Sequence, residues 1–186
     1  MGNRELKHFH TVECLFSDQT VTSHAEQGKP VLGICGGLQM LGEALVDAHG
    51  IDGNAPGLGL LPLVTCFEPD KTVRRATLLF GAVQGPWAAL AQQRVNGYEI
   101  HHGRTVQHTA LAQTGQLARE VLPGLGWQNT AGNVLGVYVH GLFEDPSVLT
   151  ALFGAQAPTL ESVFNGLADF LEQHVQPGVL NALIEP

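Results

Sequence analysis

The feature that most constrains this chain is a glycine-rich segment from Gly33 to Gln39, with the sequence Gly-Ile-Cys-Gly-Gly-Leu-Gln. The apolar run 29–32 before it predicts a buried strand, and apolar residues at helical spacing after it predict a helix. Cys35 therefore falls at a sharp strand-to-helix turn, where the neighbouring glycines let the backbone bend and approach a ligand. This pattern is typical of a nucleophile elbow, here with cysteine in place of serine. A buried structural cysteine is the alternative that the pattern alone leaves open.

Composition excludes several classes of protein. The chain has 186 residues, enough for one domain with a substantial core, and its 44% hydrophobic and 14% charged residues are typical of a globular protein. A net charge of −8 argues against nucleic-acid and anionic-membrane partners. No apolar run approaches the roughly 20 residues that cross a bilayer, and the N-terminus has no signal core. Cys14, Cys35 and Cys66 lack metal-ligand spacing, so we expect reduced thiols, no metal site and a cytoplasmic location.

Predicted strands alternate with predicted helices along the chain. This order favours an α/β fold, which we expect to be a flavodoxin-like three-layer sandwich with a mostly parallel sheet. We divide the chain into an N-terminal segment, 1–17, without a clear pattern and a single domain over 18–186. Helices are predicted over 18–27, 36–49, 145–153 and 159–174, with a last helical turn from 177; strands over 30–34, 60–67, 74–80, 95–101 and 133–140; and a turn at 102–104.

Cys35 and His140 each stand directly after a predicted central strand. Ligands of such sheets collect at the carboxyl ends of the strands, so the two side chains can meet there although they are far apart in sequence. A Cys–His pair is the minimum for nucleophilic catalysis, because the imidazole takes the thiol proton and later gives it to a leaving amine. A strand-end histidine bonded to a carbonyl is the alternative interpretation of His140.

Residues 29–42 resemble the elbow of class I glutamine amidotransferases, and in particular the cobyric acid synthase branch. Four further segments carry the likeness, which runs from about residue 24 to the C-terminus. These are Gly-Ile-Asp-Gly at 50–53, Gly-Leu-Gly-Leu-Leu-Pro-Leu at 57–63, Gly-Tyr-Glu-Ile-His-His-Gly at 97–103 and Val-His-Gly-Leu-Phe at 139–143.

The resemblance implies that a cysteine attacks the side-chain amide of glutamine, giving a thioester and ammonia, and that water then releases glutamate. The ammonia would serve an ATP-dependent synthetase domain or subunit that amidates adenosylcobyrinic acid a,c-diamide in cobalamin biosynthesis. Glutamine and that synthetase are the implied partners, with the corrinoid reached only through the synthetase. No cofactor is expected in this domain, and ATP and Mg²⁺ are expected only in the synthetase.

Carried over residue by residue, the resemblance assigns the roles in the site. Cys35 would be the nucleophile, His140 the base and the Gly36 N–H an oxyanion donor. Gln39 and the strand 97–101 would shape the glutamine pocket. Within that strand, Tyr98, Glu99 and His101 fit plain strand residues with local hydrogen bonds equally well.

The sequence departs from the family pattern in two ways. Many amidotransferases have a glutamate two positions after the histidine, whereas this chain has Leu142, so we expect a Cys–His dyad and interpret Glu144 as a helix cap. The chain also starts too late to hold the synthetase domain, or the Pro-Gly loop that supplies a second oxyanion N–H. We therefore expect a domain that is truncated at its N-terminus. Whether the truncated domain is active stays open.

Two alternatives to a cobyric acid synthase glutaminase remain. One is the glutaminase part of a related cobyrinic acid a,c-diamide synthase or of a lipid-amidating complex. The other is a non-catalytic remnant that only binds a synthetase partner.

Overall fold

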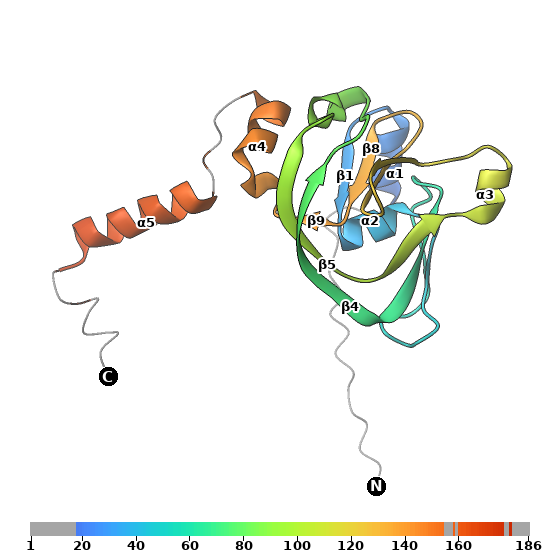
Figure 1. Cartoon of the computed structure of the whole chain (residues 1–186), viewed down its shortest axis with the longest axis horizontal. Helices are drawn as coiled ribbons and strands as arrows, with labels where there is room; N and C mark the ends of the chain where they lie inside the picture. Colours follow the sequence, from blue (N-terminus) through green and yellow to red (C-terminus); the bar gives the residue numbers. More distant parts are fainter. Residues whose placement is uncertain (1–17, 155–157, 159, 177–178, 180–186) are drawn as a thin grey trace, which may run out of the picture.

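The structure is a computed structural model that describes residues 18–154, 158, 160–176 and 179 (Figure 1). The segment 1–17 lies outside the described residues, and so does the helical turn predicted from residue 177 except for Val179. No helix in the described part is long and apolar enough to cross a membrane. The helices are α1 (Asp18–Glu26), α2 (Gly36–Leu41), α3 (Thr109–Gln113), α4 (Pro146–Phe153) and α5 (Leu160–His174), with 3₁₀ turns η1 (Gly85–Leu90) and η2 (Leu142–Glu144). The strands are β1 (Val31–Ile34), β2 (Ala44–Val46), β3 (Ala55–Pro56), β4 (Leu63–Leu79), β5 (Arg94–Gln107), β6 (Arg119–Leu122), β7 (Gly126–Gln128), β8 (Val134–Val137) and β9 (Val139–His140).

Helices and two sheets make up the fold, and the predicted α/β class is confirmed. One sheet has the strand order β1-β8-β7-β6, and the other has the order β3-β2-β4-β5-β9. In the described residues, β1 pairs in parallel with β8 and β2 with β4, whereas the other pairs are antiparallel. "Mostly parallel" is therefore a loose description of the whole, but it fits the β1–β8 pair that carries the site.

The β4–β5 hairpin is the largest element, with strands of 17 and 14 residues, and it curves around α2, β1 and β8 (Figure 1). The sequence predicts two strands, 60–67 and 74–80, and a turn at 102–104, but β4 and β5 run through both places. The register shifts between Cys66 and Lys71, opposite Gly103. Gly103 has a φ of +86°, and a Cβ there would lie 2.5 Å from the Cys66 carbonyl oxygen. Gly103 therefore marks an irregularity in the pairing of β4 with β5, and the chain does not reverse direction there.

The helix after Cys35 is shorter than predicted. The sequence predicts a helix that reaches residue 49, but α2 ends at Leu41 and Gly42 is extended, with φ −69° and ψ −174°. The Glu43 N–H donates to the Leu63 carbonyl at 2.8 Å, and the next residues form β2 beside β4. The apolar pair at 45 and 46 fits helical spacing, but it belongs to a strand, because periodicity cannot separate the two over so short a run.

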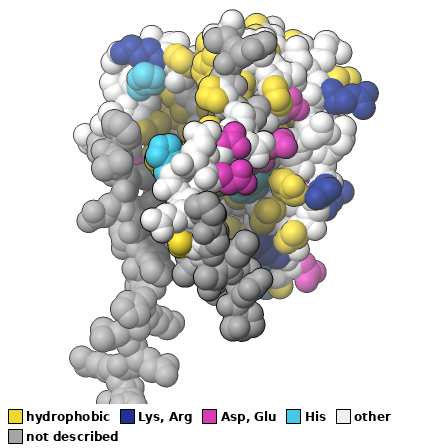
Figure 2. Space-filling model, turned by 90° about the vertical axis from the view of Figure 1, so that its left-hand side faces the viewer, with side chains coloured by type: hydrophobic (Ala, Val, Ile, Leu, Met, Phe, Trp, Pro, Cys, Tyr) yellow, Lys and Arg dark blue, Asp and Glu magenta, His cyan; other side chains and the backbone are white. Residues whose placement is uncertain are grey.

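The core lies where α2 packs on β1 and β8. Leu38 of α2 and Leu61 are fully buried there, over Gly136 of β8. Leu135, the preceding residue of β8, is fully buried as well. By contrast, α5 stands apart from this body in Figure 1. Figure 2 views the molecule from that side and shows acidic side chains near the centre of the face, with Lys and Arg side chains mostly toward its edges.

Candidate active site

Cys35 sits at the turn between β1 and α2 with φ +54° and ψ −112°. A non-glycine residue with positive φ is strained, and such strain is concentrated at functional sites. The Cys35 N–H donates to the Val137 carbonyl at 2.8 Å, so the ladder between β1 and β8 holds the turn. Gly33 is needed below it, since a Cβ there would lie 2.6 Å from the Gly37 carbonyl carbon. The elbow geometry predicted from the sequence is therefore present.

The thiol and the imidazole of His140 meet at one backbone atom. Cys35 Sγ donates to the Ile100 carbonyl oxygen of β5 at 3.2 Å, and His140 Nε2 lies 3.2 Å from the same oxygen. Because a carbonyl oxygen only accepts, His140 carries its proton on Nε2 in this arrangement. The two side chains are neighbours, with the Ile100 carbonyl as their shared acceptor.

Burial is the main influence on the thiol. It raises the pKa of Cys35 above the ordinary value of 9.0, while the Gly36 N–H and the positive charge of Lys71 act in the opposite direction. The resting nucleophile is therefore a neutral thiol, and the Gly36 N–H already faces the sulfur. This arrangement needs a base at the moment of attack, because only a thiolate is a strong nucleophile.

No carboxylate is bonded to His140 among the residues that the structure describes. Leu142, at the position where many amidotransferases have glutamate, is 1% exposed and belongs to the core. Asp145, rather than Glu144, caps α4, by accepting the Ser147 N–H at 2.9 Å. The role of helix cap predicted for Glu144 is thus taken by its neighbour.

Gln39 lies on α2, one turn after the nucleophile, and is nearly buried. Its Nε2 donates to the His102 carbonyl at 3.1 Å and to the Tyr138 hydroxyl at 3.2 Å. That hydroxyl is 2.6 Å from Thr105 Oγ1, which is 2.7 Å from Thr65 Oγ1. This buried chain of hydrogen bonds joins α2 to β4 and β5, so it fixes the elbow against the strand that carries Ile100.

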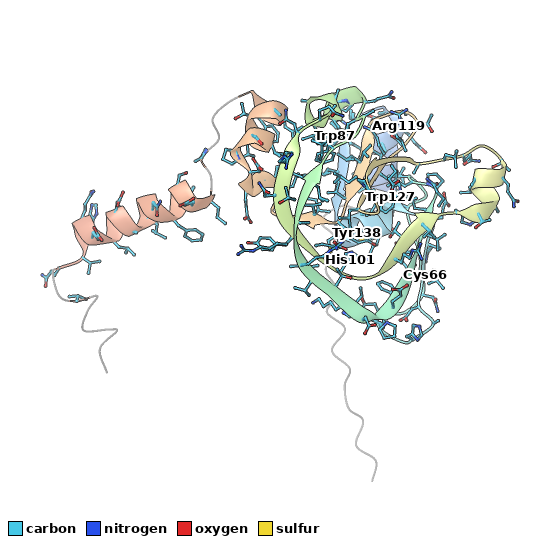
Figure 3. All side chains as sticks on the ribbon, viewed as in Figure 1. Cys66, Trp87, His101, Arg119, Trp127 and Tyr138 are labelled. Carbon is cyan, nitrogen blue, oxygen red and sulfur yellow. The ribbon has the colours of Figure 1, made fainter. Side chains whose placement is uncertain are left out.

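Glu99 and His101 contact each other and neighbouring side chains. Glu99 is 5% exposed, lies 3.0 Å from His101 Nε2 and forms an ion pair with Arg74 at 2.5 Å. The His101 ring stacks on Tyr138 with centroids 3.9 Å apart, and Figure 3 shows the two rings side by side. These contacts agree with the local structural interpretation of Glu99 and His101.

Tyr98 projects on the face of β5 opposite to Glu99 and is 40% exposed. It pairs in register with His140, and it borders a cleft of about 620 Å³ between β4, β5 and the start of α4. Of the predicted pocket residues in β5, Tyr98 is therefore the one next to open space. Among the described residues, no group of three or more His, Cys, Asp or Glu side chains is arranged to hold a metal ion.

Sequence reasoning missed two parts of the site. The Ile100 carbonyl is a backbone atom, and no side-chain pattern marks it. Tyr138 did carry a signal, because a tyrosine within the apolar run 134–139 must find a partner for its buried hydroxyl.

Comparison with known proteins gives consistent matches. A family profile described as "CobB/CobQ-like glutamine amidotransferase domain" matches residues 13–148. Among curated proteins, the cobyric acid synthase of Polaromonas sp. (strain JS666 / ATCC BAA-500) is 65% identical over 168 residues, which are 90% of this chain and 33% of the relative. The cobyric acid synthase of Leptothrix cholodnii is 55% identical over 177 residues, 91% of this chain and 34% of the relative. The chain thus spans about a third of the length of these relatives.

A solved structure supports the fold. The structure of PurLQS from Thermotoga maritima matches with a TM-score of 0.54 at 18% sequence identity, covering 74% of this chain and 66% of that one. At this identity the match concerns the arrangement of helices and strands.

Proposed function

The chain belongs to the CobB/CobQ-like glutamine amidotransferase family, and from this we propose that it is the glutaminase domain of a cobyric acid synthase. It would release ammonia from glutamine for the ATP-dependent amidation of adenosylcobyrinic acid a,c-diamide. The observation that carries the proposal is the strained Cys35 at the end of β1, with the His140 imidazole on the same carbonyl oxygen. The identity to cobyric acid synthases favours this branch over related diamide synthases and lipid-amidating complexes.

The geometry supports a dyad mechanism. Glutamine entering the site would draw the thiol away from the Ile100 carbonyl, and His140 in the tautomer that leaves Nε2 unprotonated would take the thiol proton on Nε2, the nitrogen that lies beside the thiol. Attack of Cys35 on the amide carbon would place the developing oxyanion near the Gly36 N–H. The imidazolium would then give its proton to the departing ammonia, leaving a thioester that water cleaves to glutamate.

The partners and location are part of the same proposal. Glutamine is the substrate of this domain, a synthetase domain or subunit takes up the ammonia, and the corrinoid is bound by that synthetase. ATP and Mg²⁺ would act there, so this domain would hydrolyse glutamine without a cofactor. We place the protein in the cytoplasm.

The test measures labelling of Cys35 by a diazoketone analogue of glutamine, with peptide mapping and with glutamine as a competitor. We expect Cys35 to be labelled in preference to Cys14 and Cys66, and glutamine to protect it. Glutamate release, alone and with a synthetase partner, should disappear in Cys35→Ala and His140→Ala. Equal labelling of all three thiols without protection would instead support the non-catalytic remnant.

A further inference from the structure

A row of three side chains runs from the dyad into the cleft. Arg75 of β4 pairs in register with Tyr98 of β5, and Tyr98 pairs with His140 of β9. Residues directly opposite each other on antiparallel strands project to the same face of the sheet. The Arg75 guanidinium lies 5.8 Å from the centre of the Tyr98 ring. The cleft is lined by Arg75–Thr77, Asn96–Tyr98 and Glu144–Pro146. His140 is not part of this lining, but it is the register partner of Tyr98, which is.

Charges of opposite sign face this cleft. Within the described part of the chain, neither Arg75 nor Glu144 has an ion-pair partner. The Glu144 carboxylate lies over Gly141, the residue after His140, where an added Cβ would be 3.5 Å from Oε2. The neighbouring Arg74 differs, because it faces the other side of the sheet and is paired with Glu99.

We propose that this cleft binds the α-amino-acid head of glutamine, with Arg75 on the α-carboxylate and Glu144 on the α-ammonium group. The inference rests on the proposed function, since it needs the side-chain amide to lie at Cys35 and His140. Glutamine has an uncharged amide at one end and both charges at the other, which matches the order of groups along the row. From His140 to Arg75 the row crosses two strand spacings of about 4.8 Å each. An extended glutamine with its amide at the dyad, together with the long Arg75 side chain, can span this distance.

The experiment measures how well three compounds protect Cys35 of this chain from the diazoketone analogue. Glutamine carries both charged groups, glutaramate lacks the amino group, and γ-aminobutyramide lacks the carboxylate. In Arg75→Ala we expect protection by glutamine and by glutaramate to weaken about tenfold, and protection by γ-aminobutyramide to stay the same. In Glu144→Gln, glutamine and γ-aminobutyramide should weaken while glutaramate does not. Arg94→Ala, a change of the same type at an exposed position of β5, should alter none of them.

The pattern across compounds separates recognition from general damage. An equal loss for all three compounds in Arg75→Ala, or no loss for any, overturns the assignment of the carboxylate to Arg75. The same outcomes in Glu144→Gln overturn the assignment of the ammonium group. Absence of protection by glutamine in the unaltered chain contradicts the proposed function itself. Protection that both variants leave intact contradicts only the placement of the head group.

Discussion

At the scale of single residues, burial of the Cys35 thiol decides when it reacts. The raised pKa means that the thiolate forms above the ordinary value of 9.0, and only the thiolate is alkylated efficiently. We expect the rate of Cys35 alkylation by iodoacetamide to keep rising as the pH passes that value. Lys71 lowers this pKa, so Lys71→Ala should raise it further and slow alkylation at a given pH, whereas Lys71→Arg should not. A rate that is already constant at neutral pH would show a preformed thiolate, contrary to this expectation.

Tyr138 is the residue whose hydroxyl ties the elbow to β5, and it is 1% exposed. Tyr138→Phe removes two buried hydrogen bonds, one from the Gln39 amide and one from the Thr105 hydroxyl, and leaves each group with a single partner, the His102 carbonyl or the Thr65 hydroxyl. We expect a loss of about 1–3 kcal/mol in the free energy of unfolding, measured by urea denaturation. The control is Thr77→Val, whose hydroxyl bonds to Asn96 at an exposed site, and its effect should stay within about 0.5 kcal/mol. Similar losses in both variants would mean that the buried hydrogen bonds are not the cause.

At the scale of elements, the position of Cys35 depends on how closely α2 approaches β1. A Cβ at Gly33 would lie 2.6 Å from the Gly37 carbonyl carbon, and backbone cannot move aside as a side-chain end can. Gly33→Ala should therefore cost about 1–3 kcal/mol of unfolding free energy and slow labelling of Cys35. Gly37→Ala is the matched control, because nothing lies within 4 Å of its added methyl and alanine favours a helix. Thermal unfolding of both variants checks the contrast, which would fail if Gly33→Ala were as stable as the parent chain.

The elements that the sequence predicts well are those set by local patterns. The strand–turn–helix at Cys35 needs only adjacent residues. The helix α1 was predicted from a capping Asp18 and the glycine after it, and α5 from apolar residues at helical spacing. The boundaries of β4 and β5 could not be predicted, because the glycine at 103 looks like a turn until its partner strand is known. The role of the Ile100 carbonyl could not be predicted for a similar reason. It is 65 positions from Cys35, and the fold, not a side chain, brings the two together.

At the scale of the whole molecule, the chain has a body that carries the site and a helix beyond it. The family profile ends at residue 148, within α4, and α5 begins at Leu160. The apolar side chains of α5 are largely exposed, at 51% for Leu160, 59% for Phe164 and 52% for Leu167. Since stabilisation follows the apolar area removed from water, these side chains add little to the stability of the body.

This arrangement predicts which apolar side chains matter for thermal stability. Leu135 of β8 is fully buried in the core, so Leu135→Ala should cost about 2–5 kcal/mol and lower the melting temperature by roughly 5–15 °C. Replacing both Phe164 and Leu167 by serine should leave that temperature nearly unchanged, because both side chains are already in water. Differential scanning calorimetry of the three chains makes the comparison. A loss in the double variant as large as that in Leu135→Ala would show that α5 packs against the body in solution, contrary to the structure.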